Sequence, residues 1–164
     1  MMESKEPPVP EYRKTGTGAE LYSTIRINAS PERIWAVLTD LPRYPVWNPF
    51  IRRIKGELTE GHRLTVELQP SGSSGMTIRP VFLKVDVTRE LRWKGHLFIS
   101  GLFDGEHIFE IRPLDNQSSL FIQREIFSGL LLPLFEGMLK GGTARGFAEM
   151  NKALKEQAEG SVPE

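Results

Sequence analysis

Apolar and polar residues alternate over much of the chain between residues 19 and 127, and this two-residue period predicts β-strands. In the stretch ELYSTIRI, Leu21, Ser23, Ile25 and Ile27 fall on one face. Turn-forming stretches such as LTEGH and PSGSSG separate further strands, which are predicted over 51–57, 63–69, 76–88, 91–98, 105–113 and 119–127. Because the connections are short, we expect neighbouring strands to be antiparallel.

Helices are predicted before and after this meander. A first helix is expected within SPERIWAVLTD, where Ser30 can cap it and Pro31 suits the first helical position. The three prolines of LPRYPVWNPF keep a second helix short. Beyond residue 127, apolar residues recur at helical spacing at Phe135, Leu139, Phe147, Met150 and Leu154. The chain therefore predicts a strand, two short helices, a meander and a long C-terminal helix.

The long helix is unusually rich in glycine, with Gly137, Gly141, Gly142 and Gly146. Each glycine inside a helix costs about 1 kcal/mol relative to alanine, so tertiary packing must hold this helix together. One interpretation is that the glycines allow a close approach to the sheet or a local kink. The other is that a soft helix middle lets the lid of a cavity move.

The two ends of the chain differ in composition from its middle. Proline and glycine interleave with charged residues over residues 1–18, which predicts a flexible arm, and residues 160–164 are expected to be frayed. Residues 19–159 have the length of one domain. The start has no apolar signal region, and glycine, proline and glutamate break the longest apolar stretch, residues 127–139. Neither a secretion signal nor a membrane-spanning segment is predicted.

Charge and cysteine content exclude several functions. The 21 basic and 21 acidic side chains cancel and form no long run of one sign, which argues against a nucleic-acid partner. The absence of cysteine excludes disulfides and thiolate chemistry, and zinc would depend on three histidines at no recognisable spacing. We therefore expect no metal, no cofactor and a cytoplasmic location.

One predicted strand, DGEHIFEIRPL at 104–114, carries a histidine on its apolar face. His107 shares the parity of Phe109 and Ile111, whereas Glu106 and Glu110 fall on the other side.

Two features that resemble nucleotide-binding motifs carry no such function. PSGSSG lacks the lysine and the following helix of a phosphate-binding loop, and GGTARG does not follow a strand.

The order of elements, together with four sequence stretches, resembles the SRPBCC superfamily. This superfamily includes START-type lipid-transfer domains, birch-pollen-allergen-like proteins and bacterial polyketide cyclases, and the polyketide-cyclase/dehydrase-like branch is the most similar. The stretches span nearly the whole domain and are INASPERIWAVLTDLPRYPVWNPFI at 27–51, GEHIFEIRPL at 105–114, REIFSGLLLPLF at 124–135 and GFAEMNKALKEQAE at 146–159. The resemblance implies an α+β helix-grip fold, in which a curved antiparallel sheet of six to seven strands wraps around the C-terminal helix.

That fold implies an apolar cavity between the sheet and the helix, with His107, Gln123 and Glu125 as a small polar cluster. The cluster either orients a ligand or closes a structural hydrogen-bond network. The other residues expected to line the cavity are Leu83, Val85, Trp93, Leu97, Phe109, Phe121, Phe127, Phe147 and Met150. Trp47 and Arg79 are expected near its mouth, Trp47 mainly as a packing anchor.

The resemblance leaves three function classes open. The first is binding of a small hydrophobic or aromatic molecule, similar to a lipid, sterol or polyketide, by a monomer or homodimer. The second is a cyclase or dehydratase that uses His107 and Glu125 as an acid–base pair, without metal or cofactor. The third is a protein-interaction module of the chaperone-activator kind, which an exposed apolar patch on the outer face of the sheet would favour.

Overall fold

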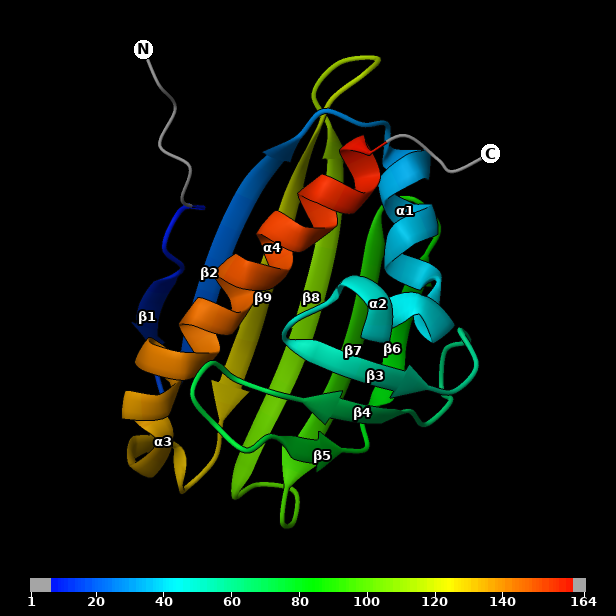
Figure 1. The fold of residues 1–164 in the computed structure, drawn as a ribbon. Coiled ribbons are helices and arrows are strands. Elements are labelled where there is room, and N and C mark those ends of the chain that lie inside the picture. The colour runs from blue at the N-terminus through cyan, green and yellow to red at the C-terminus, as the bar shows by residue number, and fades with distance from the viewer. Residues whose placement is uncertain (1–6, 161–164) are drawn as a thin grey trace.

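The computed structural model describes residues 7–160, and its main feature is a six-stranded antiparallel sheet crossed by one long helix (Figure 1). The strand order is β1-β2-β9-β8-β7-β6. The strands are β1 (Glu11–Thr15), β2 (Gly18–Ile27), β6 (Val81–Asp86), β7 (Glu90–Leu97), β8 (Phe103–Pro113) and β9 (Ser119–Ser128). Helix α4 (Ala144–Glu159) lies diagonally across the inner face of this sheet (Figure 1). This arrangement confirms the predicted α+β helix-grip fold.

Short helical segments join the sheet to α4. After β2 come α1 (Pro31–Thr39), a 3₁₀ turn (Leu41–Arg43) and α2 (Tyr44–Trp47), and before α4 come α3 (Leu132–Met138) and a π-helical turn (Leu139–Thr143). The predicted cap of α1 is present, because the Arg33 amide donates a hydrogen bond to Ser30 Oγ at 3.2 Å. None of the helices within residues 7–160 has the length and apolar composition needed to cross a membrane.

A second, three-stranded sheet lies over the lower part of the main sheet (Figure 1). It consists of β3 (Ile51–Lys55), β4 (Thr65–Leu68) and β5 (Met76–Ile78) in that order. The prediction of one strand over 76–88 is wrong, because the strand is interrupted at Pro80. The two parts, β5 and β6, belong to different sheets. Proline has no backbone N–H to donate to a ladder, and this favours a break at that position.

A β-bulge in β6 changes which residues of this strand face the interior. The pairing with β7 shifts between Phe82 and Lys84, so Phe82 is buried against Trp93 with ring centroids 6.1 Å apart. Leu83 is the extra residue of the bulge, and it is 45% exposed. The expectation that Leu83 faces the interior is therefore wrong.

The arm predicted over residues 1–18 also needs correction. Residues 11–15 form the edge strand β1, which pairs with β2 through a tight turn at Gly16, where φ is +48°. Tyr12 is the residue of β1 that packs against the core. Residues 1–6 and 161–164, which the prediction assigned to the arm and to the frayed end, lie outside the described residues.

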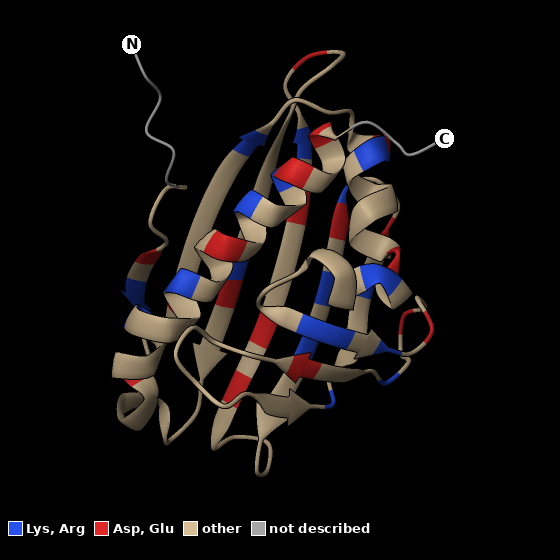
Figure 2. Ribbon diagram, viewed as in Figure 1, with Lys and Arg blue, Asp and Glu red and all other residues tan. Residues whose placement is uncertain are grey.

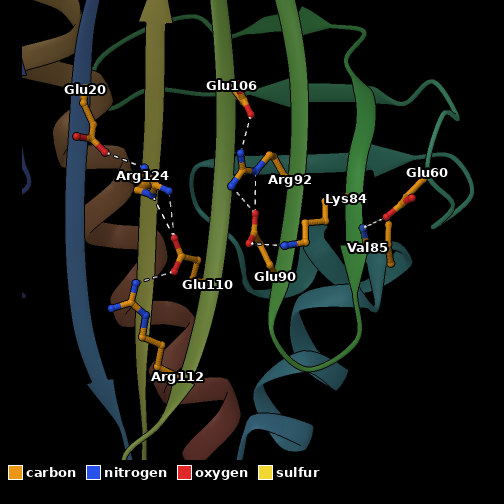
Figure 3. A network of polar contacts seen from close by, with 10 residues as sticks. All are labelled: Glu20, Glu60, Lys84, Val85, Glu90, Arg92, Glu106, Glu110, Arg112 and Arg124. Atoms are coloured by element: carbon orange, nitrogen blue, oxygen red, sulfur yellow. Dashed lines mark hydrogen bonds and ion pairs between the residues drawn. The ribbon is translucent and has the colours of Figure 1, made fainter. Parts of the chain in front are cut away.

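The outer face of the main sheet carries a ladder of charged side chains (Figure 3). Arg124 bridges Glu20 and Glu110, at 3.1 and 3.2 Å, and Arg92 bridges Glu90 and Glu106, at 2.6 and 3.0 Å. Burial raises the pKa of Glu90, but the hydrogen bonds from Lys84 and Arg92 outweigh this effect and hold that pKa below its ordinary value.

The same ladder covers apolar surface on the outer face. Ile108 lies on the outer face between Arg92 and Arg124 in the sheet register, yet it is fully buried. Long arginine side chains commonly cover apolar neighbours with their aliphatic stems while their charged ends remain in water. The middle of this face is therefore charged, and it does not present the apolar patch that would favour an interaction module.

Candidate functional site

A small cavity of about 60 Å³ lies between the lower ends of β7, β8 and β9, the β3–β5 sheet and the turn that leads into α4. Its wall is mainly apolar and includes Leu68, Ile78, Trp93, Leu97, Phe127 and Leu139. Glu125 and Thr143 add polar groups to this wall, and His96 adds another although its side chain is largely exposed. None of the described residues that line the cavity is lysine or arginine. Such a wall suits an apolar molecule that carries few polar groups.

The cavity wall contains some of the predicted site residues and lacks others. Trp93, Leu97, Glu125 and Phe127 line it as expected. The remaining buried candidates lie in the core outside the wall, and they are His107, Phe109, Phe121, Gln123, Phe147 and Met150. Val85 is partly buried against the core and is also not in the wall. The expected polar cluster therefore forms, but Glu125 is its only member that meets the cavity.

Two residues predicted near the mouth do not line the cavity. Arg79 is exposed, and its backbone carbonyl accepts a hydrogen bond from Arg63 Nη1 at 3.0 Å. Arg79 was expected near the cavity mouth, but it is not among the residues that line the cavity, because β5 ends beside it at Ile78. Trp47 packs on Tyr44 with ring centroids 5.1 Å apart, in agreement with its predicted role as a packing anchor.

The β3–β5 side of the wall is not predicted by the sequence pattern. Phe50, Leu68, Met76 and Ile78 close the cavity from the second sheet. The alternation of apolar and polar residues predicts strands over 51–57 and 63–69, but it does not predict that these strands fold over the main sheet. Pro80 is the sequence signal that marks this break.

Two glycines lie side by side in the wall, because Gly95 of β7 pairs with Gly105 of β8. A Cβ atom at Gly105 would lie 2.5 Å from Glu125 Oε1. The glycine therefore leaves the space that the Glu125 carboxylate occupies. Glu125 Oε1 lies over a residue of the cavity wall, and the side chain as a whole is 16% exposed.

Behind Glu125 runs a chain of buried polar side chains. Glu125 Oε2 lies 3.4 Å from His107 Nδ1, and His107 Nε2 lies 3.1 Å from Gln123 Oε1. Gln123 Nε2 donates to Asn151 Oδ1 at 2.7 Å and to the Phe147 carbonyl at 3.4 Å. Asn151 Nδ2 donates to Ser23 Oγ at 2.9 Å, and the Ser23 hydroxyl donates to the Gln123 carbonyl at 2.8 Å. We call these five side chains the polar relay.

The structure adds Ser23 and Asn151 to the cluster that the sequence predicted. The sequence pattern predicts Ser23 on the inner face of its strand but indicates no role for it. Asn151 lies one helical turn after Phe147 on the buried side of α4. A polar residue within an apolar stripe is the signal that identifies it, because buried amides need hydrogen-bond partners.

The loop between β4 and β5 closes the cavity against the π-helical turn. The Ser71 amide donates to the Gly142 carbonyl at 3.3 Å, and Arg145 Nη2 donates to the Ser71 carbonyl at 3.5 Å. Both hydrogen bonds are long, so this seal is weak. A Cβ at Gly142 would lie 2.8 Å from the Ser71 carbonyl oxygen, which shows that glycine permits the close approach here.

The loops below the cavity are uncharged and apolar. Residues 95–103 and 126–135 contain no Asp, Glu, Lys or Arg, and Figure 2 shows the β7–β8 loop and the segment leading into α3 without charge. The two stretches are neighbours, since the Leu130 amide donates to the Gly101 carbonyl at 3.1 Å. The large exposed apolar side chains on them are Phe98, Ile99, Ile126, Leu130 and Leu134. An apolar molecule that approaches the cavity from this end meets no fixed charge on these two stretches.

Residues 18–159 match the model of a family described as polyketide cyclase / dehydrase and lipid transport. The chain belongs to this family. Among solved structures, this family member is similar to the Zhui aromatase/cyclase from Streptomyces sp. R1128. The TM-score is 0.70 and the sequence identity is 16%. That match covers 85% of this chain and 93% of the other.

Two further solved structures share the fold of this family member. A START superfamily protein from Mycobacterium smegmatis has a TM-score of 0.67 and 22% identity, and the match covers 85% of this chain and 97% of the other. The norcoclaurine synthase from Thalictrum flavum, solved with dopamine and hydroxybenzaldehyde, has a TM-score of 0.64 and 14% identity, with coverage of 85% and 87%. No significant match to a curated protein was found. At these identities the similarity shows the fold.

Proposed function

We propose that this protein binds a small apolar or aromatic molecule in the cavity between the main sheet, the β3–β5 sheet and the turn before α4. The observation that carries the proposal is a wall of apolar side chains interrupted by one partly exposed carboxylate, Glu125, that is supported from behind by buried polar groups. Binding pockets are typically apolar with a few placed polar groups. The family description, which names polyketide cyclases and lipid transport, supports the same class of ligand.

The cavity must widen before a ligand enters, because about 60 Å³ is far below the roughly 300–1,000 Å³ of a pocket for a drug-sized molecule. We expect the loop at Ser71 and the π-helical turn to separate, since the two hydrogen bonds that join them are long. Their separation exposes Leu68 and Leu139 from opposite sides of the cavity.

We expect that Leu97→Trp lowers the affinity for naphthalene at least tenfold, because the larger side chain fills the cavity that Leu97 lines. Leu83→Trp is the matched control, since Leu83 lies on the outer face of the same strand pair and is 45% exposed. Isothermal titration calorimetry measures both affinities, and thermal unfolding verifies that both variants are folded. The proposal is wrong if naphthalene does not bind the unmodified protein, or if it binds both variants equally well.

A second experiment tests the opening at Ser71. Gly142→Ala places a methyl group 2.8 Å from the Ser71 carbonyl and pushes the loop away, so we expect naphthalene to associate about threefold faster. Gly141→Ala is the control, because a Cβ there has no atom within 4 Å. Stopped-flow fluorescence of naphthalene gives the association rates. Equal rates for the two variants would place the entrance elsewhere.

Acid–base catalysis of a cyclase or dehydratase is a second candidate function, and the proximity of His107 and Glu125 at 3.4 Å favours it. Glu125 is the group that would touch a substrate, and His107 would position it from behind. Glu125→Gln would then abolish turnover of a polyketide substrate while leaving its affinity nearly unchanged. Loss of affinity without any measurable turnover in the unmodified protein would instead assign Glu125 to binding.

A further inference from the structure

The direction of every hydrogen bond in the polar relay is fixed from its far end. The Ser23 hydroxyl donates to the Gln123 carbonyl, so its oxygen accepts from Asn151 Nδ2. Asn151 therefore presents Oδ1 to Gln123, and Gln123 donates with Nε2 and presents Oε1 to His107. An amide oxygen only accepts, so His107 Nε2 must carry a hydrogen.

This tautomer determines what Glu125 presents to the cavity. With its hydrogen on Nε2, His107 turns Nδ1 towards Glu125 Oε2, and these two atoms are 3.4 Å apart. The other oxygen, Oε1, lies over Gly105 in the cavity wall. A carboxylate oxygen accepts hydrogen bonds, so Oε1 is the acceptor that Glu125 presents to the cavity.

Resting on the function proposed above, we propose that the cavity selects apolar molecules that carry a neutral hydroxyl group, phenolic or aliphatic, and rejects carboxylates. A ligand hydroxyl can donate to Glu125 Oε1 while its apolar frame lies against Trp93 and Leu97. A carboxylate would face this acceptor, and none of the described lining residues is a lysine or arginine that could compensate its charge. The stretches 95–103 and 126–135 add no lysine or arginine below the cavity.

The relay assigns positioning roles to two residues that meet no ligand. Asn151 and Ser23 hold Gln123 in one amide orientation, and Gln123 in turn holds the tautomer of His107. Without them Gln123 could rotate by half a turn and present its NH₂ group to His107. The acceptor at the cavity is thus set by groups buried on the far side of the relay.

Three probes with one ring system test the selection at neutral pH, where they differ only in their polar group: naphthalene, 2-naphthol and 2-naphthoate. In the unmodified protein we expect 2-naphthol to bind about tenfold more tightly than naphthalene, as expected for one added hydrogen bond, and 2-naphthoate to bind no better than naphthalene. Isothermal titration calorimetry gives the three dissociation constants.

Two substitutions of Glu125 distinguish the effect of its hydrogen-bond acceptor from the effect of its side-chain volume. Glu125→Leu removes the acceptor, so the preference for 2-naphthol should fall to about one. Glu125→Gln should keep most of the preference, because its NH₂ group can donate to His107 Nδ1 while its oxygen still faces the cavity. The inference is overturned if 2-naphthoate binds best, or if Glu125→Leu keeps the preference. Naphthalene binding without any preference overturns this inference alone, whereas a failure of all three probes to bind overturns the proposed function as well.

Discussion

Gly146→Ala is expected to lower the free energy of unfolding by about 1–3 kcal/mol, although alanine alone would favour a helix by about 1 kcal/mol. A Cβ at Gly146 would overlap the Phe50 ring and lie 2.8 Å from its Cε2 atom. Phe50 is 2% exposed and packs on Phe147 with ring centroids 5.6 Å apart, so any shift of its ring disturbs this packing. Urea denaturation measures the change.

Gly141→Ala is the matched control for this prediction, because a Cβ at Gly141 meets no atom within 4 Å. This substitution should be neutral or should stabilise the protein by up to about 1 kcal/mol. Opposite signs for the two variants would show that Gly146 is retained for the contact with Phe50. Equal effects would mean that only the softness of the helix matters.

The glycine-rich C-terminal segment shows how an interpretation from sequence is resolved by packing. The sequence allowed either close approach or a mobile lid. Gly146 and Gly142 serve close approach, to Phe50 and to Ser71, whereas no atom lies within 4 Å of a Cβ at Gly137 or Gly141. Close approach and a mobile lid are both compatible with Gly142, since its contact with Ser71 closes the cavity.

The fold was predictable where local pattern and tertiary environment agree. His107, Phe109 and Ile111 alternate in the sequence, and all three are buried on the inner face of β8. The strand over 76–88 was not predictable in this way, because Pro80 and the bulge at Leu83 change the parity within one apolar run. A shift of one residue moves every following side chain to the opposite face.

The edge strand β1 was missed for a different reason. Within EYRKT only Tyr12 packs against the core, so alternation is nearly invisible in the sequence, and the neighbouring prolines and glycines are typical of a flexible arm. Pairing with β2 supplies the structure that local sequence does not specify. The polar relay was predicted only in part, because local sequence does not show that Asn151, on a helix distant in sequence, contacts Gln123.

Gln123→Leu is expected to destabilise the protein by about 3 kcal/mol, because it leaves His107 Nε2 and Asn151 Oδ1 buried without their partner. Each such unpaired group costs roughly 1–3 kcal/mol, and a domain with about 5–15 kcal/mol of stability remains folded after this loss. Urea denaturation followed by circular dichroism gives the value. Gln157→Leu, an exposed position on α4, is the control and should change stability by less than about 0.5 kcal/mol.

A double-mutant cycle with Asn151→Leu separates the relay from simple loss of packing. If Gln123 and Asn151 stabilise the fold through their hydrogen bond of 2.7 Å, removing both should cost at least about 1 kcal/mol less than the sum of the two single changes. The reason is that the second substitution removes a group that the first has already left unpaired. Strict additivity would contradict the relay as a coupled unit, and Glu125 would then owe its orientation to Gly105 and His107 alone.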